Sequence, residues 1–65
     1  MYSFWNLFLS RARVVYSYAA ADTDEIDISE SEVIEILLED PSGWWRGKKT
    51  NGEEGLFPGT YVEKM

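Results

Sequence analysis

The chain has 65 residues with no cysteine and no histidine, and its 12 acidic and 6 basic residues give a net charge of −6. A chain this short forms one domain at most, and without cysteine it has neither a disulfide framework nor a thiolate metal site. Histidine is the usual general base near pH 7, and negative charge repels phosphates, so the composition argues against an enzyme, a nucleic-acid-binding protein and a protein bound to anionic membranes.

Residues 1–10, MYSFWNLFLS, form an apolar leader without a charged side chain. The leader lacks the basic start and the small-residue cleavage site of a secretory signal, and it is too short for a stable isolated helix in water. It also lacks the Lys and Arg side chains that usually hold helices at a membrane interface. We therefore place it outside a domain at residues 11–65. Disorder, packing or dimer formation, and membrane contact stay open as its roles.

After the leader, apolar residues recur with a period of two, a pattern that predicts β-strands. The pattern covers residues 12–17, 26–28 and 33–38, and a further strand is expected at residues 44–50, before the Asn51-Gly52 turn. We expect five short strands in a small barrel or two packed sheets. Gly47 is expected where a neighbouring segment approaches closely. The expected core residues are Ala12, Val14, Ile26, Ile28, Ile34, Ile36, Phe57 and Val62.

Acidic residues gather in one part of the chain. Nine of the twelve fall between Asp22 and Asp40, a stretch without Lys or Arg. Such a stretch is usually a solvated face, and otherwise it attracts a basic ligand. The ten aromatic residues are more than so small a core can bury. Exposed aromatic rings beside local acidity suggest a ligand that is both apolar and cationic.

Turn signals divide the second half of the chain. Asp-Pro-Ser-Gly at residues 40–43 predicts a turn, because proline fixes φ and glycine accepts positive φ. Asn51-Gly52 is a strong hairpin signal and predicts a type I′ turn, which needs positive φ at both residues. Pro58 lacks a backbone donor and should end its strand, and residues 61–63 form a short last strand.

Three motifs together resemble a Src homology 3 (SH3) domain: VVYSY at residues 14–18, Trp44-Trp45, and GLFPGTYV at residues 55–62. Each motif is weak alone, but their order and spacing over residues 12–64 are specific. The resemblance implies an all-β fold, a small five-stranded, partly open barrel. It would have a long acidic loop, a distal hairpin at Asn51-Gly52 and a short 3-10 turn before the last strand. The family binds proline-rich segments in the polyproline II conformation.

A surface of rigid aromatic rings suits such a ligand on physical grounds. A polyproline II segment has no internal hydrogen bonds and little conformational freedom left to lose. Tyr and Trp rings offer it apolar faces, with donors at their tips for its free carbonyl groups. The rings should supply most of the affinity, since exposed ion pairs add only about 0.2–1 kcal/mol each.

The resemblance assigns residues to two proline pockets and to a third pocket for a basic side chain. The first proline pocket would be lined by Tyr16 and Tyr61. The second would be lined by Tyr18, Trp44, Pro58 and Tyr61. The third would lie between Trp44 and the acidic loop and would take an Arg or Lys of the ligand. Its main acidic residue would be Glu25, with Asp22 and Asp24 nearby.

Each assignment has a simpler structural alternative. Tyr16 is in phase with the core residues of its strand and could belong to the core. Pro58 could serve only to end a strand, and the acidic side chains could simply be solvated. Trp44 and Trp45 are neighbours on a strand, so they point to opposite faces. We assign Trp44 to ligand binding and Trp45 to packing across the sheet.

Three residues depart from the family pattern. Ser17 stands where an Asp is usual, Ser31 where the turn before the next strand usually has Gly, and Thr60 where an Asn is usual. Ser31 would strain its turn if that turn requires positive φ. Thr60 has a hydroxyl group but no amide, so we expect an altered peptide preference without loss of the fold.

We therefore expect a non-catalytic cytoplasmic module, part of a larger scaffold, cytoskeletal or signalling protein. It would bind proline-rich segments flanked by Arg or Lys, with no cofactor, no metal, and neither nucleic acid nor membrane as a partner. The alternative is an assembly element that self-associates through residues 1–10. A hydrolase that uses paired carboxylates such as Asp24 and Asp27 is disfavoured, because so small a barrel offers no substrate cleft.

Overall fold

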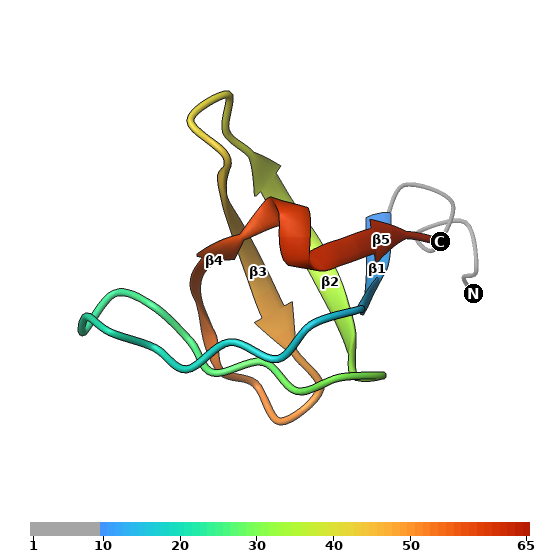
Figure 1. The fold of residues 1–65 in the computed structure, drawn as a ribbon, viewed down its shortest axis with the longest axis horizontal. Helices are drawn as coiled ribbons and strands as arrows, with labels where there is room; N and C mark the ends of the chain where they lie inside the picture. Colours follow the sequence, from blue (N-terminus) through green and yellow to red (C-terminus); the bar gives the residue numbers. More distant parts are fainter. Residues whose placement is uncertain (1–9) are drawn as a thin grey trace, which may run out of the picture.

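The computed structural model describes residues 10–65, which form five antiparallel strands and one 3-10 turn (Figure 1). The sheet has the strand order β4-β3-β2-β1-β5. The expected all-β five-stranded fold, with a 3-10 turn before the last strand, is confirmed. Within residues 10–65 no helix is long and apolar enough to cross a membrane. The elements are β1 (Ser10–Val14), β2 (Val33–Glu39), β3 (Trp44–Lys49), β4 (Glu54–Pro58), η2 (Gly59–Tyr61) and β5 (Val62–Lys64).

Alternating apolar residues of the strands bury one face of the sheet. Seven of the eight expected core residues are buried, and the eighth, Val62, is partly buried and packs against them. Gly47 lies on β3 at a close approach, as expected. A Cβ atom there would lie 2.7 Å from both Ile34 Cγ2 and Phe57 Cε2. The interior therefore has no room for a side chain at position 47.

Between β1 and β2, the alternation of apolar residues in the sequence predicts more strand than the structure has. The expected strand at residues 12–17 is wrong at its end, because β1 stops at Val14 and the chain then bends. Tyr16 leaves the core phase and is 62% exposed, which rules out the alternative that it is a core residue. Ile26 and Ile28 are buried, but they lie in a loop that pairs only through isolated bridges. The spacing of Ile26 and Ile28 therefore reflects burial of both side chains, without a continuous ladder of strand hydrogen bonds.

The hairpin between β3 and β4 is confirmed, but its turn type is not I′. Only Ser31 among the non-glycine residues in 10–65 has positive φ, so Asn51 does not, whereas Gly52 has φ 95°. Gly52 N donates to Lys49 O at 2.9 Å. The connection is therefore longer than a two-residue type I′ loop, and it places a glycine in the left-handed region. Asn51 contributes differently, because its Oδ1 accepts a hydrogen bond from Glu53 N at 2.9 Å.

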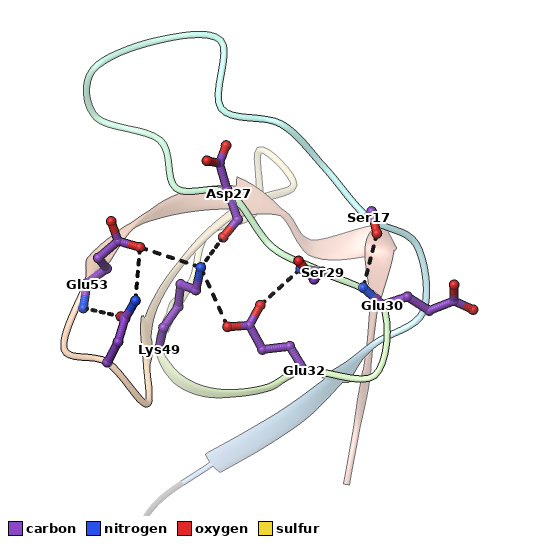
Figure 2. Close-up of polar contacts among 8 residues, drawn as sticks. Ser17, Asp27, Ser29, Glu30, Glu32, Lys49 and Glu53 are labelled. Carbon is purple, nitrogen blue, oxygen red and sulfur yellow. Dashed lines mark hydrogen bonds and ion pairs between the residues drawn. The ribbon is translucent and has the colours of Figure 1, made fainter.

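Lys49 fastens the base of the acidic loop to the hairpin, as Figure 2 shows. Its ammonium group donates to Asp27 O at 2.7 Å and lies 3.5 Å from carboxylate oxygens of both Glu32 and Glu53. Glu32 accepts a further hydrogen bond from Ser29 N at 2.9 Å. The side chains of Lys49 and Glu32 are 11% and 23% exposed, so solvent screens this pair less than the pair with Glu53, whose side chain is 59% exposed. One cation thus joins two regions that are distant in the sequence, the acidic loop and the hairpin between β3 and β4.

Ser31 occupies a strained backbone position, as its departure from the family pattern suggested. Its φ is 77° in the turn closed by the hydrogen bond from Glu32 N to Ser29 O, 3.0 Å long. Ser31 is the third residue of this turn, where a type II turn requires positive φ. The hydrogen bond from Ser31 N to Val14 O, 2.8 Å long, holds it there.

We predict that Ser31→Gly raises the free energy of unfolding by about 1 kcal/mol. Glycine removes the cost of about 1–2 kcal/mol for a side chain in the left-handed region, and the greater freedom of the unfolded chain offsets part of the gain. Urea denaturation measures the change. Ser29→Gly in the same turn is the control and should not stabilise the chain. Equal effects of the two substitutions would contradict the assignment of strain to Ser31.

Candidate ligand-binding surface

Four aromatic side chains lie in a continuous row, which we call the aromatic surface: Tyr16, Tyr61, Tyr18 and Trp44. The ring centroids of Tyr16 and Tyr61 are 6.0 Å apart, those of Tyr61 and Tyr18 are 5.8 Å apart, and those of Tyr18 and Trp44 are 5.9 Å apart. All three contacts are edge to face, a favourable geometry for aromatic pairs. The rings are therefore ordered by one another as well as by the backbone.

The backbone brings these rings together from three segments: the segment after β1, the start of β3, and η2. Val15 N and Tyr16 N both donate to Tyr61 O, at 2.8 and 3.2 Å, which joins the end of β1 to η2. Tyr18 forms an isolated backbone bridge with Ile28. Trp44 begins β3 and is 39% exposed. Tyr16 and Trp44 are exposed, whereas Tyr18 and Tyr61 are partly buried and pack against the core. No cavity is found among residues 10–65.

The two adjacent tryptophans point to opposite sides of β3, as the alternation requires. Trp44 pairs with Pro58, the half-buried last residue of β4, and faces Tyr18. Trp45 instead packs against the hydrophobic core. It also covers Gly59, where an added Cβ atom would lie 2.5 Å from the indole ring. The assignment of Trp45 to packing is therefore confirmed, and Trp44 stays available at the surface.

The expected acidic residues lie next to the Trp44 end of the aromatic surface. Glu25 is half-buried, and its Oε1 accepts hydrogen bonds from Tyr18 Oη at 2.6 Å and from Ala21 N at 2.8 Å. Asp22 and Asp24 are exposed. One carboxylate oxygen from each of Asp22, Asp24 and Glu25 lies within 4.8 Å of the other two. The three groups are close enough to contact one cationic group, although exposed carboxylates alone do not define a metal site.

The hydrogen bond between Tyr18 and Glu25 shifts the protonation of both groups. Donation from the Tyr18 hydroxyl, and then from Ala21 N–H, holds the pKa of Glu25 below its ordinary value. The same hydrogen bond, followed by desolvation, raises the pKa of Tyr18 to about 12. Glu25 is therefore a carboxylate and Tyr18 a neutral phenol throughout the neutral pH range.

Gly55 allows the acidic loop to lie against β4, and the sequence analysis did not identify this role. Leu56 N donates to Asp24 O at 2.9 Å, and Ile26 N donates to Leu56 O at 3.0 Å. A Cβ atom on Gly55 would lie 2.7 Å from Ile26 Cγ2 and 2.9 Å from Asp24 O. A glycine inside a strand is a signal of such an approach, so the role was open to prediction. Figure 1 shows the loop running beside β4.

Two further polar contacts fix the acidic loop. Ala20 N donates to Asp27 Oδ1 at 2.7 Å, which joins the two arms of the loop. Ser17 Oγ accepts a hydrogen bond from Glu30 N at 3.0 Å (Figure 2). The serine at this position thus supports the neighbouring turn. Thr60 is exposed beside Tyr61 in η2.

Charge is distributed unevenly over the fold. The six basic residues all lie on strands, and two of them pair with strand carboxylates, Arg46 with Glu54 at 3.0 Å and Lys64 with Glu39 at 2.8 Å. The loop between β1 and β2 carries acidic residues and no basic residue. Negative charge therefore gathers on this loop, and the part of it beside the aromatic surface would attract a cationic ligand.

We predict that the stability advantage of the wild type over Tyr18→Phe depends on pH at both extremes. The pKa of Tyr18 is raised from 10.0 to about 12 by folding, so its stabilisation is complete below pH 10 and disappears as pH rises toward 12. The pKa of Glu25 is lowered, so its stabilisation is present above its ordinary value of 4.5 and disappears as pH falls below it.

Denaturant unfolding of both variants at a series of pH values measures this advantage. It should be flat near neutrality and decrease toward acid and toward alkali. An advantage that does not change across the whole series would contradict the Tyr18–Glu25 hydrogen bond.

Comparisons with known proteins agree with this geometry. A family model described as SH3 domain matches residues 13–59. The human protein "Proline-serine-threonine phosphatase-interacting protein 1" is 42% identical over 53 residues, which cover 82% of this chain and 12% of that protein. The myosin IC heavy chain of Acanthamoeba castellanii is 38% identical over 53 residues, which cover 82% of this chain and 4% of that protein. The chain thus spans a small part of these relatives.

Solved structures match over most of the chain. The C-terminal SH3 domain of myosin IB from Entamoeba histolytica, bound to an EhFP10(GEF) peptide, superposes with a TM-score of 0.82 and 37% identity. That match covers 88% of this chain and 83% of the other. The Acanthamoeba myosin I SH3 domain bound to Acan125 gives a TM-score of 0.79 and 34% identity, and it covers 86% of this chain and 95% of the other.

Proposed function

We propose that this chain, which belongs to the SH3 domain family, binds proline-rich segments that carry an Arg or Lys beside the prolines. The observation that carries the proposal is the row of four edge-to-face rings, open to solvent, which ends beside three carboxylates. The structural neighbours bound to a peptide and to Acan125 support it. The module itself contributes recognition, and we propose no catalytic role for it.

The proline residues of the ligand would lie against the aromatic surface. A polyproline II segment rises about 3.1 Å per residue and repeats every three residues, so it presents prolines to successive ring pairs. One proline would contact Tyr16 and Tyr61, and the next would lie among Tyr18, Trp44 and Pro58. Because the segment is already extended and the rings are held from behind, little conformational freedom is lost on binding.

The basic side chain of the ligand would lie over Trp44, facing the acidic loop. A cation near an indole ring gains a cation–π attraction, and Glu25, Asp22 and Asp24 add ion-pair attraction. The two aspartates are exposed, so their contribution is small at physiological salt and acts mainly on orientation and on the rate of encounter. Thr60 offers the ligand a hydroxyl group in place of an amide, which we expect to change the peptide preference.

We propose that the module acts in the cytoplasm as part of a scaffold, cytoskeletal or signalling protein. The match to a myosin heavy chain and to drebrin-like proteins, of which it covers between 4% and 14%, supports a cytoskeletal setting. The alternative role, self-association through residues 1–10, concerns residues 1–9 that lie outside the described part of the chain. Ser10 itself belongs to β1, where it pairs with Ile36.

Self-association stays a prediction with a direct test. Sedimentation of the full chain at rising concentration, with and without residues 1–9, separates the two roles. A concentration-dependent dimer that disappears on deletion would support assembly through the leader. A monomer in both cases would remove this alternative and leave the binding module alone.

We predict that Trp44→Ala weakens binding of a proline-rich, Arg-flanked peptide at least about thirtyfold, as expected for an aromatic hot spot. The free energy of unfolding should change by less than about 1 kcal/mol, because Trp44 lies at the surface. Fluorescence or NMR titration measures binding, and denaturant unfolding measures stability.

Trp45→Ala is the matched control on the opposite side of the same strand. It removes a ring that packs against the core, so it should cost about 3 kcal/mol of stability. If Trp44→Ala bound the peptide with the affinity of the wild type, this result would contradict the proposal that the aromatic surface is the ligand site.

A further inference from the structure

The Tyr18 side chain contacts both the other rings of the aromatic surface and a carboxylate of the acidic loop. Its ring meets Tyr61 and Trp44 edge to face, with centroids 5.8 and 5.9 Å away. Its hydroxyl group donates to Glu25 Oε1 at 2.6 Å. A phenolic hydroxyl has a single proton to donate. While that proton is shared with Glu25, it is not available to a main-chain carbonyl of a ligand.

Glu25 is held in one orientation by this hydrogen bond and by its surroundings. Its Oε1 also accepts from Ala21 N at 2.8 Å, and its backbone is tied to Leu56 through a bridge. Its second oxygen, Oε2, has no hydrogen-bond partner within residues 10–65. A carboxylate that is already oriented loses less side-chain freedom when a cation binds. The free Oε2 is therefore a prepared acceptor.

We propose that the Tyr18 hydroxyl determines the preference for a basic ligand residue, because it positions Glu25 so that Oε2 accepts the cation. The ring of Tyr18 contacts the prolines, and its hydroxyl acts on the ligand only through Glu25. The inference rests on the proposed function and adds to it the group that sets charge specificity. Donation to ligand carbonyl groups is then left to Trp44 Nε1 and to the hydroxyl groups of Tyr16, Thr60 and Tyr61.

Two peptides test whether the ring of Tyr18 contacts the prolines while its hydroxyl acts only through Glu25. They share one proline-rich sequence and differ only at the flanking position, which is arginine in one and norleucine in the other. The ratio of their dissociation constants isolates the cation preference from binding of the prolines. We expect a ratio of about fivefold in the wild type, near the upper end for an exposed ion pair. Titrations by NMR give both constants together with the sites of contact.

Three substitutions separate positioning from charge. Tyr18→Phe should lower the ratio to about twofold, and Glu25→Gln should lower it to about the same value or below. Glu25→Asp keeps the charge on a shorter side chain that does not reach Tyr18, so it should behave like Tyr18→Phe. Tyr16→Phe is the control, and it should leave the ratio unchanged whatever it does to the two affinities.

A second measurement does not depend on any peptide. NMR titration of the Glu25 carboxyl group should show that its pKa rises toward the ordinary value in Tyr18→Phe. A purely structural role of the hydroxyl would leave the peptide ratio of the folded variant unchanged. Should Tyr18→Phe fail to fold, Glu25→Asp carries the test, since it leaves the aromatic surface intact.

The outcomes distinguish this inference from the proposed function. An unchanged ratio of the two dissociation constants in Tyr18→Phe and Glu25→Asp would overturn the inference. If Tyr18→Phe at the same time weakened the binding of both peptides equally, the hydroxyl would instead donate to the ligand backbone. A higher ratio would show that the hydroxyl competes with the cation, which also overturns it. Wild-type binding of both peptides without preference for arginine defeats the inference and the basic-residue part of the proposed function, but leaves the binding of proline-rich segments standing. Binding of neither peptide defeats the proposed function as a whole.

Discussion

A row of aromatic rings stays open at a protein surface only if the chain behind it holds each ring in place, because rings left free would collapse onto one another or into the core. Here the carbonyl of Tyr61 accepts two backbone hydrogen bonds from the end of β1, and edge-to-face contacts carry the order along the row to Trp44. The exposed rings are therefore rigid as well as apolar. In the proposed function, this order lowers the conformational cost of binding an extended ligand.

The acidic loop is the second part of the surface, and it is held from three sides. Gly55 lets it approach β4, Lys49 fixes its base through Asp27 O, and the Tyr18–Glu25 hydrogen bond fixes its tip. Because the basic residues lie on the strands, the carboxylates of the loop keep their negative potential beside the rings. In the proposed function, aromatic contact and charge act on adjacent parts of one ligand. The Tyr18 side chain contacts both the neighbouring rings and Glu25.

Alternation and turn signals in the sequence predicted most of the core, the hairpin and the opposite orientations of Trp44 and Trp45, because these features follow from local backbone geometry. The end of β1 was not predicted, since it depends on bonds to a distant segment, such as that between Tyr16 N and Tyr61 O. The turn at Asn51 was predicted but its type was wrong, although its hydrogen bonds are local. The resemblance brought the site residues together, but the Tyr18–Glu25 bond was not foreseen. It links residues seven positions apart across a loop whose path no periodic pattern describes.

The most direct test of the account is an NMR titration of the isotope-labelled chain with a proline-rich, Arg-flanked peptide. The account predicts saturable shifts that cluster on Tyr16, Tyr18, Glu25, Trp44 and Tyr61. Signals from the opposite end of the sheet, at the hairpin between β3 and β4, should stay unchanged. Shifts centred on that hairpin, or no shifts at millimolar peptide, would contradict the claim that this aromatic and acidic surface is a binding site.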